Sequence, residues 1–262
     1  MQIGYGIIME NIIVEKQDGI FKVKLNRPDV RNAVNLKTAN ELEEAWDIFE
    51  KDQSLKVGII TSTSENFCAG ADLKDIDALS RRSMNPAGPL GMTRKIPGKP
   101  VIAAISGYCV AGGFEIALWA DFRICDETAK FGFLERRFGV PLIDGGTQRL
   151  PLISGLGNAL YLITTGNLID AKEALRMGIV NEVVPSGKVM ERAMELASTI
   201  ASYPQNTLLS DREAVYSSTD LDSGIMHEQR NGYYILNSGV PFEGAKVFEG
   251  GKGRGGKSID GK

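Results

Sequence analysis

Hydrophobic and polar residues alternate at the start of the chain in the pattern of half-buried strands. The alternation covers Ile12–Lys16 and returns over Phe21–Leu25. Between them, Asp18-Gly19 has the composition of a tight hairpin turn. Over Leu36–Lys51 the spacing changes to that of an amphipathic helix. The pattern therefore predicts a β-hairpin followed by a helix.

Continuous apolar runs follow, and each predicts a strand that is buried on both faces. In chain order they are Leu55–Thr61, Val101–Ser106 and Asp121–Cys125. Helical patterns near 71–79 and 113–120 separate these runs, and strands that alternate with helices indicate parallel βαβ units. Residues 81–99 are rich in proline and glycine and predict a mobile segment.

From residue 148 onward the pattern becomes mostly helical. Predicted helices cover about 148–165, 170–177, 186–202, 206–217, 221–237 and 241–248, and one strand, Ile179–Val184, interrupts them. We therefore predict an α/β core over residues 1–200 and a helical C-terminal region over 201–262. A flexible glycine-rich tail is expected from about residue 250.

Composition argues against several classes of protein. The 30 basic and 33 acidic residues give a net charge of −3, so we expect no nucleic-acid partner. No apolar run approaches the ~20 residues of a membrane span, and the first residues lack the pattern of a secretory signal. The cysteines Cys68, Cys109 and Cys125 lack metal-binding spacing and are interpreted as reduced thiols of a cytoplasmic protein. His227 is the single histidine, which excludes a His-rich metal site, and we expect no metal.

Residues 251–258, GKGRGGKS, match a phosphate-binding loop pattern literally. That mechanism needs a strand before the loop and a helix after it, so that the helix N-terminus faces the phosphates. Only residues 259–262 follow, which is too few for such a helix. The segment is therefore interpreted as a basic tail.

A glycine pair followed by a carboxylate is the first sign of chemistry. Gly112-Gly113 stands where a loop becomes a helix, and the N–H groups and dipole of a helix start suit a developing oxyanion. Glu115 lies on about the same face as Gly112, and Glu135 follows a second apolar run. Two such carboxylates could hold a water molecule and exchange protons with a carbon acid. Each also has an ordinary interpretation: Glu115 as a glutamate favoured by the helix dipole, and Glu135 as a surface residue beside two arginines.

Five ordered segments resemble the enoyl-CoA hydratase/isomerase (crotonase) family along nearly the whole chain. They are LNRP at 25–28 with Asn32-Ala33, FCAGADLK at 67–74, IAAISGYCVAGGFE at 102–115, FGFLE at 131–135 and GGTQRL at 145–150. The resemblance implies an α/β fold with a crotonase-like spiral core of ββα units and a helical C-terminal region. It also implies an acyl-CoA thioester as substrate, no cofactor beyond the coenzyme A of that substrate, and a homotrimer or homohexamer.

The resemblance further implies roles for individual residues. The N–H groups of Ala71 and Gly112 would hold the thioester oxygen. Glu115 would deprotonate a water molecule that attacks the β-carbon, and Glu135 would deliver a proton to the α-carbon, which hydrates a 2-enoyl-CoA. Apolar neighbours would raise the pKa of a glutamate toward the working pH. Further substrate contacts are implied for Arg27, Ala69, Asp72, Leu73 and Lys74.

Asp144 is the main departure from the family pattern, since a carboxylate precedes the glycine pair Gly145-Gly146. It could cap the helix that starts near Gly145. Alternatively it is a third acid at the substrate pocket, which would fit a double-bond isomerase, a racemase or a thioester hydrolase. Asp29 and Arg31 also differ from the family pattern and leave the contacts with the CoA phosphates open. A non-catalytic binding protein on the same scaffold is disfavoured by the intact pair of glutamates.

Overall fold

The computed structural model describes residues 5–217 of the 262-residue chain. The chain divides into two compact units, Met1–Ala201 and Ser202–Lys262. Within the second unit the structure describes one helix, α8 (Gln205–Ser217). The helices predicted over 221–237 and 241–248, the glycine-rich tail and His227 lie outside the described residues.

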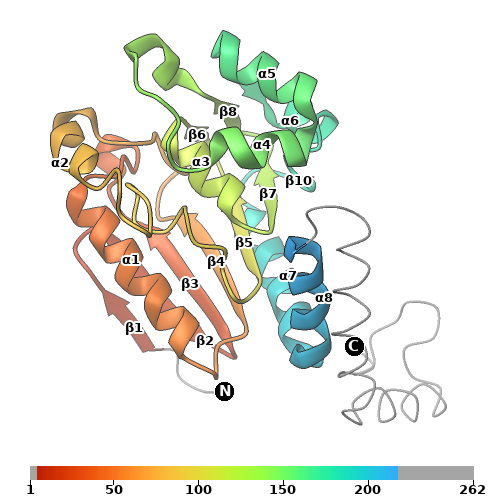
Figure 1. Ribbon diagram of the computed structural model, residues 1–262. Helices are drawn as coiled ribbons and strands as arrows, with labels where there is room; N and C mark the ends of the chain where they lie inside the picture. The colour runs from red at the N-terminus through yellow and green to blue at the C-terminus, as the bar shows by residue number, and fades with distance from the viewer. Residues whose placement is uncertain (1–4, 218–262) are drawn as a thin grey trace. The chain divides into compact units, whose positions relative to one another are not determined.

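A seven-stranded sheet runs through the first unit in the order β1-β2-β3-β4-β5-β7-β10 (Figure 1). The strands are β1 (Tyr5–Ile8), β2 (Ile12–Gln17), β3 (Ile20–Leu25), β4 (Val57–Ser62), β5 (Val101–Ile105), β7 (Phe122–Asp126) and β10 (Glu182–Val184). The first three strands pair antiparallel, and every pairing from β3 to β10 is parallel. Asp18 and Gly19 form the predicted turn, both with positive φ, 51° and 79°.

A smaller sheet of three short strands was not predicted. It consists of β6 (Tyr108–Val110), β8 (Lys130–Gly132) and β9 (Ile169–Asp170), in the order β6-β8-β9. Strands of two or three residues are too short to display a two-residue period, so the pattern of the sequence could not indicate them. The sheet matters for the site because β6 leads into the glycine pair and β8 leads into the turn that carries Glu135.

The helices of the first unit mostly follow the predicted ranges, and the helix over Leu36–Lys51 is confirmed. Expected as one helix, residues 148–165 form two, separated by Gly155, which has a φ of 79°. The helical segments are η1 (Pro28–Val30), α1 (Leu36–Lys51), η2 (Leu73–Asp75), α2 (Ile76–Arg81), α3 (Gly112–Trp119), η3 (Leu134–Phe138), α4 (Gly146–Ser154), α5 (Leu156–Thr165), α6 (Ala171–Arg176) and α7 (Val189–Ser202).

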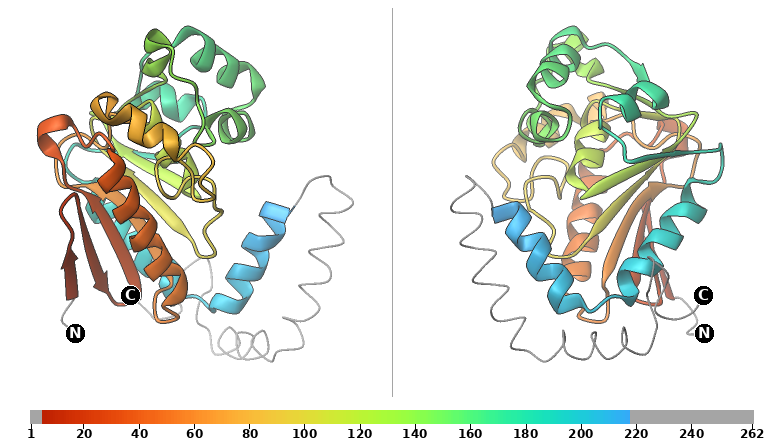
Figure 2. Two further views of the ribbon diagram at one scale, coloured as in Figure 1. Left: turned by 60° about the vertical axis from the view of Figure 1, so that its left-hand side comes forward. Right: turned by 90° about the vertical axis from the view of Figure 1, so that its right-hand side faces the viewer.

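Helix α1 covers one face of the large sheet and α7 covers the other (Figure 2). Neighbouring residues of a strand therefore belong to different hydrophobic cores. Ile60 packs in the core between the sheet and α1, and Ile59 packs in the core between the sheet and α7. The strands β4 and β5 are buried on both faces, which explains why they appear in the sequence as continuous apolar runs.

Residues 82–100 contain no helix or strand, but the expectation of a mobile segment is wrong for the middle of this range. Ala87, Leu90, Met92 and Thr93 are at most 2% exposed. Gly91 lies directly against α1, where an added Cβ would overlap the backbone of this helix. The proline and glycine residues here allow the backbone to pack closely against its neighbours and do not indicate mobility.

Candidate active site

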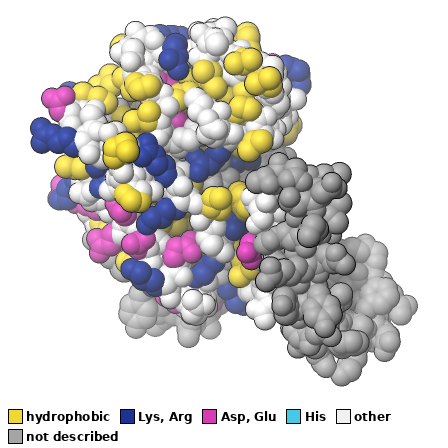
Figure 3. Space-filling view, viewed as in Figure 1, with side chains coloured by type: hydrophobic (Ala, Val, Ile, Leu, Met, Phe, Trp, Pro, Cys, Tyr) yellow, Lys and Arg dark blue, Asp and Glu magenta, His cyan; other side chains and the backbone are white. Residues whose placement is uncertain are grey.

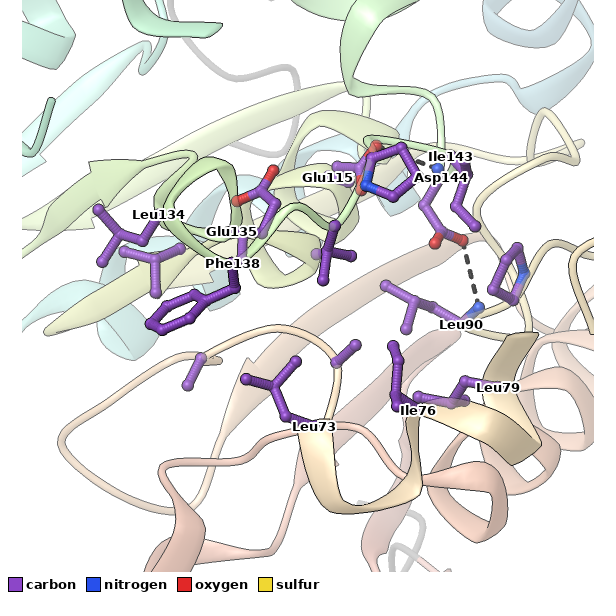
Figure 4. A pocket seen from close by; sticks show the side chains of 18 of the residues that line it. Leu73, Ile76, Leu79, Leu90, Glu115, Leu134, Glu135, Phe138, Ile143 and Asp144 are labelled. Atoms are coloured by element: carbon purple, nitrogen blue, oxygen red, sulfur yellow. Dashed lines mark hydrogen bonds between the residues drawn. The ribbon is translucent and has the colours of Figure 1, made fainter. Parts of the chain in front are cut away.

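A cavity of about 940 Å³ lies between α2, the packed residues 88–93, α3 and η3 (Figure 4). Seven of the ten site residues expected from the sequence line it: Ala69, Ala71, Leu73, Gly112, Glu115, Glu135 and Asp144. These residues are contributed by separate loops and short helices, which the two sheets bring together.

Arg27, Asp72 and Lys74 do not line the cavity. The Arg27 guanidinium forms an ion pair with Asp72, with Nη1 and Oδ2 separated by 3.1 Å, and it also donates to the carbonyl of Ala33. The Asp72 carboxylate caps η2 by accepting a hydrogen bond from the backbone N–H of Lys74 at 3.2 Å. Arg27 and Asp72 thus brace the loop that carries Ala71, and a direct contact of these three residues with substrate stays a prediction.

Two residues that line the cavity, Ala71 and Gly112, have backbone N–H groups with no acceptor within residues 5–217. Val34 accepts from Asp72 N–H and donates to Gly70 O, both at 2.8 Å, so the intervening Ala71 directs its own N–H away from Val34. Gly112 is the first residue of α3, where the N–H group has no helical partner. Among the described residues neither N–H has an acceptor. A Cβ added to Gly112 would lie 3.5 Å from Ala71 N, which places the two donors side by side.

The backbone at Ala111 is strained, with φ 53° and ψ −132°, a conformation that is rare for a residue with a side chain. The Ala111 N–H donates to Gly132 O at 2.9 Å, and its carbonyl accepts from Phe114 N–H at 2.9 Å. Two residues after Ala111, an added Cβ on Gly113 would overlap the backbone of Cys68. The turn at Ala111 is therefore held by its hydrogen bond to Gly132 and by close packing against Cys68. These contacts maintain the strained backbone that orients the Gly112 N–H.

Glu115 lies in the first turn of α3 but is only 3% exposed, so it is not the solvated helix-start glutamate that its position alone suggests. Its Oε1 atom accepts hydrogen bonds from Gly146 N–H at 2.8 Å and from Asp144 N–H at 3.0 Å. Burial raises the pKa of Glu115 to about 8; the charge of Asp144 adds to this rise and the two N–H donors oppose it.

Glu135 lies in η3 and is 7% exposed, so the interpretation as a surface glutamate is wrong. Of the neighbouring arginines, Arg136 donates from Nε to Ile163 O at 3.3 Å, and Arg137 lines the same cavity as Glu135. In the described part of the chain, neither carboxylate oxygen of Glu135 has a hydrogen-bond partner in another residue. Burial raises the pKa of Glu135 to about 7, which its own backbone N–H and the charge of Arg136 offset only in part.

Asp144 is 4% exposed and does not cap α4. The N-cap position belongs to Gly145, with a φ of 98° and no side-chain cap, so the capping interpretation is wrong. Instead the Asp144 carboxylate accepts hydrogen bonds from Leu90 N–H at 3.2 Å and from the Thr93 hydroxyl. Burial raises the pKa of Asp144, and these donors lower it in part. Leu90 and Thr93 were missed because the sequence around them reads as an ordinary loop.

The remaining lining is mostly apolar, with two arginines that sequence reasoning did not assign. Arg31 and Arg137 line the cavity, and the Arg31 guanidinium stacks 5.3 Å from the ring centroid of Tyr108. In residues 5–217 no cluster of three or more His, Cys, Asp or Glu is arranged to hold a metal, and no helix has the length and apolarity to cross a membrane. The three cysteines are buried and unpaired.

Known proteins match both the sequence and this fold. The enoyl-CoA hydratase/isomerase family matches residues 15–244. A probable enoyl-CoA hydratase of Rhizobium meliloti (strain 1021) is 37% identical over 225 residues, 84% of this chain and 88% of the relative. The crotonyl-CoA hydratase of Syntrophomonas wolfei is 37% identical over 226 residues, 84% and 87% of the two chains. A crystal structure of an enoyl-CoA hydratase from Mycobacterium tuberculosis H37Rv has a TM-score of 0.86 at 31% identity, over 92% of this chain and 96% of the other.

These matches extend over most of the chain, and the solved structures share its arrangement of sheets and helices. The crotonase-like fold expected from the five sequence segments is therefore confirmed. The chain belongs to the enoyl-CoA hydratase/isomerase family.

Proposed function

We propose that this protein is an enoyl-CoA hydratase that adds water across the 2,3 double bond of a 2-enoyl-CoA thioester to give a 3-hydroxyacyl-CoA. The observation that carries the proposal is the pair of buried carboxylates, Glu115 and Glu135, on one side of a single cavity (Figure 4). The relatives named as enoyl-CoA and crotonyl-CoA hydratases support the same activity.

The N–H groups of Ala71 and Gly112 form the oxyanion hole of the proposed mechanism. Addition of water to the β-carbon moves charge onto the thioester oxygen, and two N–H donors stabilise that charge as it develops. Removal of one donor from such a hole typically costs ~3–4 kcal/mol of transition-state stabilisation. The strained turn at Ala111 supports this role, because a conformation that costs about 1–3 kcal/mol persists only where the surroundings hold it.

Glu115 and Glu135 transfer the protons. The Oε1 atom of Glu115 is fixed by two N–H donors, which leaves Oε2 to accept a proton from the water that attacks the β-carbon. Glu135 has no partner in another described residue and donates its proton to the α-carbon. One O–H bond of water and the C2–C3 π bond break while a C–O and a C–H bond form, and the proton that Glu115 takes from water balances the one that Glu135 gives up. Burial raises the pKa values of Glu115 and Glu135 to about 8 and about 7, where each group can give and take a proton.

The reaction needs no cofactor, because coenzyme A enters as part of the substrate. The thioester would pass Ala69 and Leu73, which line the cavity, on the loop that Arg27 and Asp72 brace. We place Lys74, which is exposed beside this loop, with the substrate contacts as well. The acyl chain would lie along the apolar part of the lining, which includes Ile76, Leu79, Leu90, Val140 and Ile143.

The working form is proposed to be a homotrimer or a homohexamer in the cytoplasm. A cytoplasmic location fits three buried thiols that form no disulfide. Large hydrophobic side chains are exposed on α4 and α5, where Leu152, Leu156 and Leu160 are 88%, 65% and 50% exposed (Figure 3). Such a surface on a single chain indicates a partner, although we expect the C-terminal region over 201–262 to contribute most subunit contacts. Sedimentation equilibrium on the full chain would give the mass of the assembly.

Hydration of crotonyl-CoA is the direct test of the proposed activity. We expect the absorbance of the conjugated thioester to disappear and the mass of the product to increase by one water. No hydration of crotonyl-CoA or of longer 2-enoyl-CoA thioesters would contradict the proposal. Asp144, as a third buried acid, favours double-bond isomerisation, racemisation or thioester hydrolysis as the second candidate. Isomerisation leaves the mass unchanged, and hydrolysis releases coenzyme A.

A further inference from the structure

A third carboxylate lies in the part of the cavity wall that is otherwise apolar. Asp144 is 4% exposed, lines the cavity and lies next to Ile143 and Leu90 (Figure 4). A wall that receives only an alkyl chain gains nothing from a buried carboxylate, since burial of a polar group without a full set of partners is unfavourable. The proposed hydration mechanism does not use the side chain of Asp144. Its carboxylate is therefore unexplained by that mechanism.

The carboxylate is held in one orientation. Its Oδ1 atom accepts hydrogen bonds from Leu90 N–H at 3.2 Å and from the Thr93 hydroxyl. Arg149 Nη1 donates to the backbone carbonyl of Asp144 at 3.0 Å, and its other terminal nitrogen donates to the carbonyl of Thr93. Gly88 closes the far side, where an added Cβ would lie 3.0 Å from Oδ1. Asp144 thus has the rigid support that a binding group requires.

The second oxygen, Oδ2, is left for the cavity. Both hydrogen bonds to the carboxylate go to Oδ1, and within residues 5–217 none reaches Oδ2. Oδ2 is also not one of the fully buried side-chain atoms that lack a partner. Figure 4 shows the carboxylate directed into the space between Ile143 and Leu90.

The backbone of Asp144 fixes where along the substrate this oxygen acts. Its N–H donates to Glu115 Oε1 at 3.0 Å, so Asp144 directly adjoins the carboxylate that handles the attacking water. On the proposed mechanism that water attacks the β-carbon, C3 of the acyl chain. The next atoms of the chain, C4 and C5 and their substituents, then pass closest to Asp144.

We propose that Asp144 forms a polar subsite for a hydroxyl group carried on C4 or C5 of the acyl chain. A hydroxyl both donates and accepts a hydrogen bond, so it fits Oδ2 whether the carboxyl group is ionised or protonated. A methyl group in the same place would leave Oδ2 in contact with hydrocarbon. This inference rests on the proposed hydratase function and adds to it a class of substrate, the hydroxylated 2-enoyl-CoA thioesters.

Pairs of substrates that differ only by hydroxyl and methyl test the subsite. The first pair is 4-hydroxybut-2-enoyl-CoA and pent-2-enoyl-CoA, and the second is 5-hydroxypent-2-enoyl-CoA and hex-2-enoyl-CoA. We expect the full chain to show a kcat/KM at least about tenfold higher for the hydroxyl member of one pair, because a site that hydrogen-bonds a hydroxyl discriminates strongly against its absence. Both members are measured on one preparation, so incomplete folding cancels in the ratio.

Substitutions at Asp144 identify the group that recognises the hydroxyl. In Asp144→Leu we expect the ratio of kcat/KM for the hydroxyl substrate to kcat/KM for the methyl substrate to fall about 100-fold, so that the methyl substrate becomes the preferred one. In Asp144→Asn, which keeps the shape and can still hydrogen-bond, the hydroxyl member should remain preferred. Asp77→Leu is the matched control, because Asp77 is exposed on the same helix as Ile76 and Leu79 but does not line the cavity. Its ratio should equal that of the unmodified chain.

Three results would overturn the subsite. The first is hydration of crotonyl-CoA without preference for the hydroxyl member of either pair. The second is a ratio that Asp144→Leu leaves unchanged, and the third is an equal loss on all substrates in Asp144→Asn, which would assign Asp144 to proton transfer.

Binding of saturated analogues separates failure of the subsite from failure of the proposed function. If no thioester is hydrated, the hydratase proposal fails, and calorimetry with 4-hydroxybutanoyl-CoA and pentanoyl-CoA still tests the subsite. Tighter binding of the hydroxyl compound, lost in Asp144→Leu, is the expected result. Equal binding of the two compounds would overturn the subsite.

Discussion

The two turns that carry Glu115 and Glu135 have the same origin and opposite environments. Each follows a strand of the small sheet, β6 in one case and β8 in the other. Glu115 is fixed by two backbone donors, whereas neither oxygen of Glu135 has a partner in another described residue. One carboxylate is therefore oriented by the protein, and the other is buried without a hydrogen-bond partner in another described residue.

The difference comes from what packs on each turn. The start of α4, at Gly145 and Gly146, lies over α3 so closely that an added Cβ on Gly146 would be 3.0 Å from the Glu115 side chain. Past the end of η3, Gly139 has a φ of 71°, and an added Cβ there would have no atom of the described residues within 4 Å. A buried carboxylate with hydrogen-bond partners is compensated for the loss of water, whereas one without partners costs stability.

The largest expected effect is on turnover. We expect Glu115→Gln and Glu135→Gln each to lower kcat on crotonyl-CoA by about 10²–10⁴-fold, since each removes one proton-transfer group and keeps the shape of the side chain. The KM should change little in Glu135→Gln. Steady-state kinetics with Glu127→Gln, an exposed glutamate outside the cavity, provide the control. Nearly full activity in either variant would remove that residue from the mechanism.

An intermediate effect is expected on stability, and it should have opposite signs at the two sites. Glu115→Met removes the acceptor of two buried N–H groups and should lower the free energy of unfolding by about 2 kcal/mol. Glu135→Met replaces an unpartnered buried carboxylate and should leave the free energy of unfolding unchanged or raise it by about 1 kcal/mol. Urea unfolding at one protein concentration measures both. An equal decrease in the free energy of unfolding for the two variants would show that the hydrogen-bond partners of Glu115 do not make it more important for stability than Glu135.

The smallest expected effect is on the pH dependence of kcat/KM. Glu115 must be ionised to accept a proton, so kcat/KM should decrease as the pH drops below the Glu115 pKa of about 8. Glu135 must be protonated to donate, so kcat/KM should decrease as the pH rises above the Glu135 pKa of about 7. Because the two conditions overlap most between pH 7 and 8, we expect an optimum there and about a tenfold loss for each pH unit beyond it. The alkaline limb should disappear in the residual activity of Glu135→Gln. A flat profile from pH 6 to 9 would contradict these assignments.

Prediction from the sequence was most accurate where the elements are long and their period is clear. The hairpin and Leu36–Lys51 were located closely, because six or more residues with one buried face display their period. The strands β6, β8 and β9 were missed, since two or three residues cannot display a period. The residues alone singled out Gly112, Glu115 and Glu135 as candidates, with ordinary interpretations of both glutamates left open. The resemblance to a known family added Ala71 and the role of each residue.

The sequence by itself determined the order of the main helices and strands, the glycine pair before Glu115 and the family. The tertiary structure was needed to show that Glu115 and Glu135 line one cavity and that, within residues 5–217, Glu115 has hydrogen-bond partners in other residues whereas Glu135 has none. It was also needed to show that Asp144 accepts a hydrogen bond from Thr93 and does not cap a helix. The physical reason is that periodicity reports which face of a local element is buried. Hydrogen-bond partners 29 and 51 residues apart are chosen by how the loops pack, which no local pattern records.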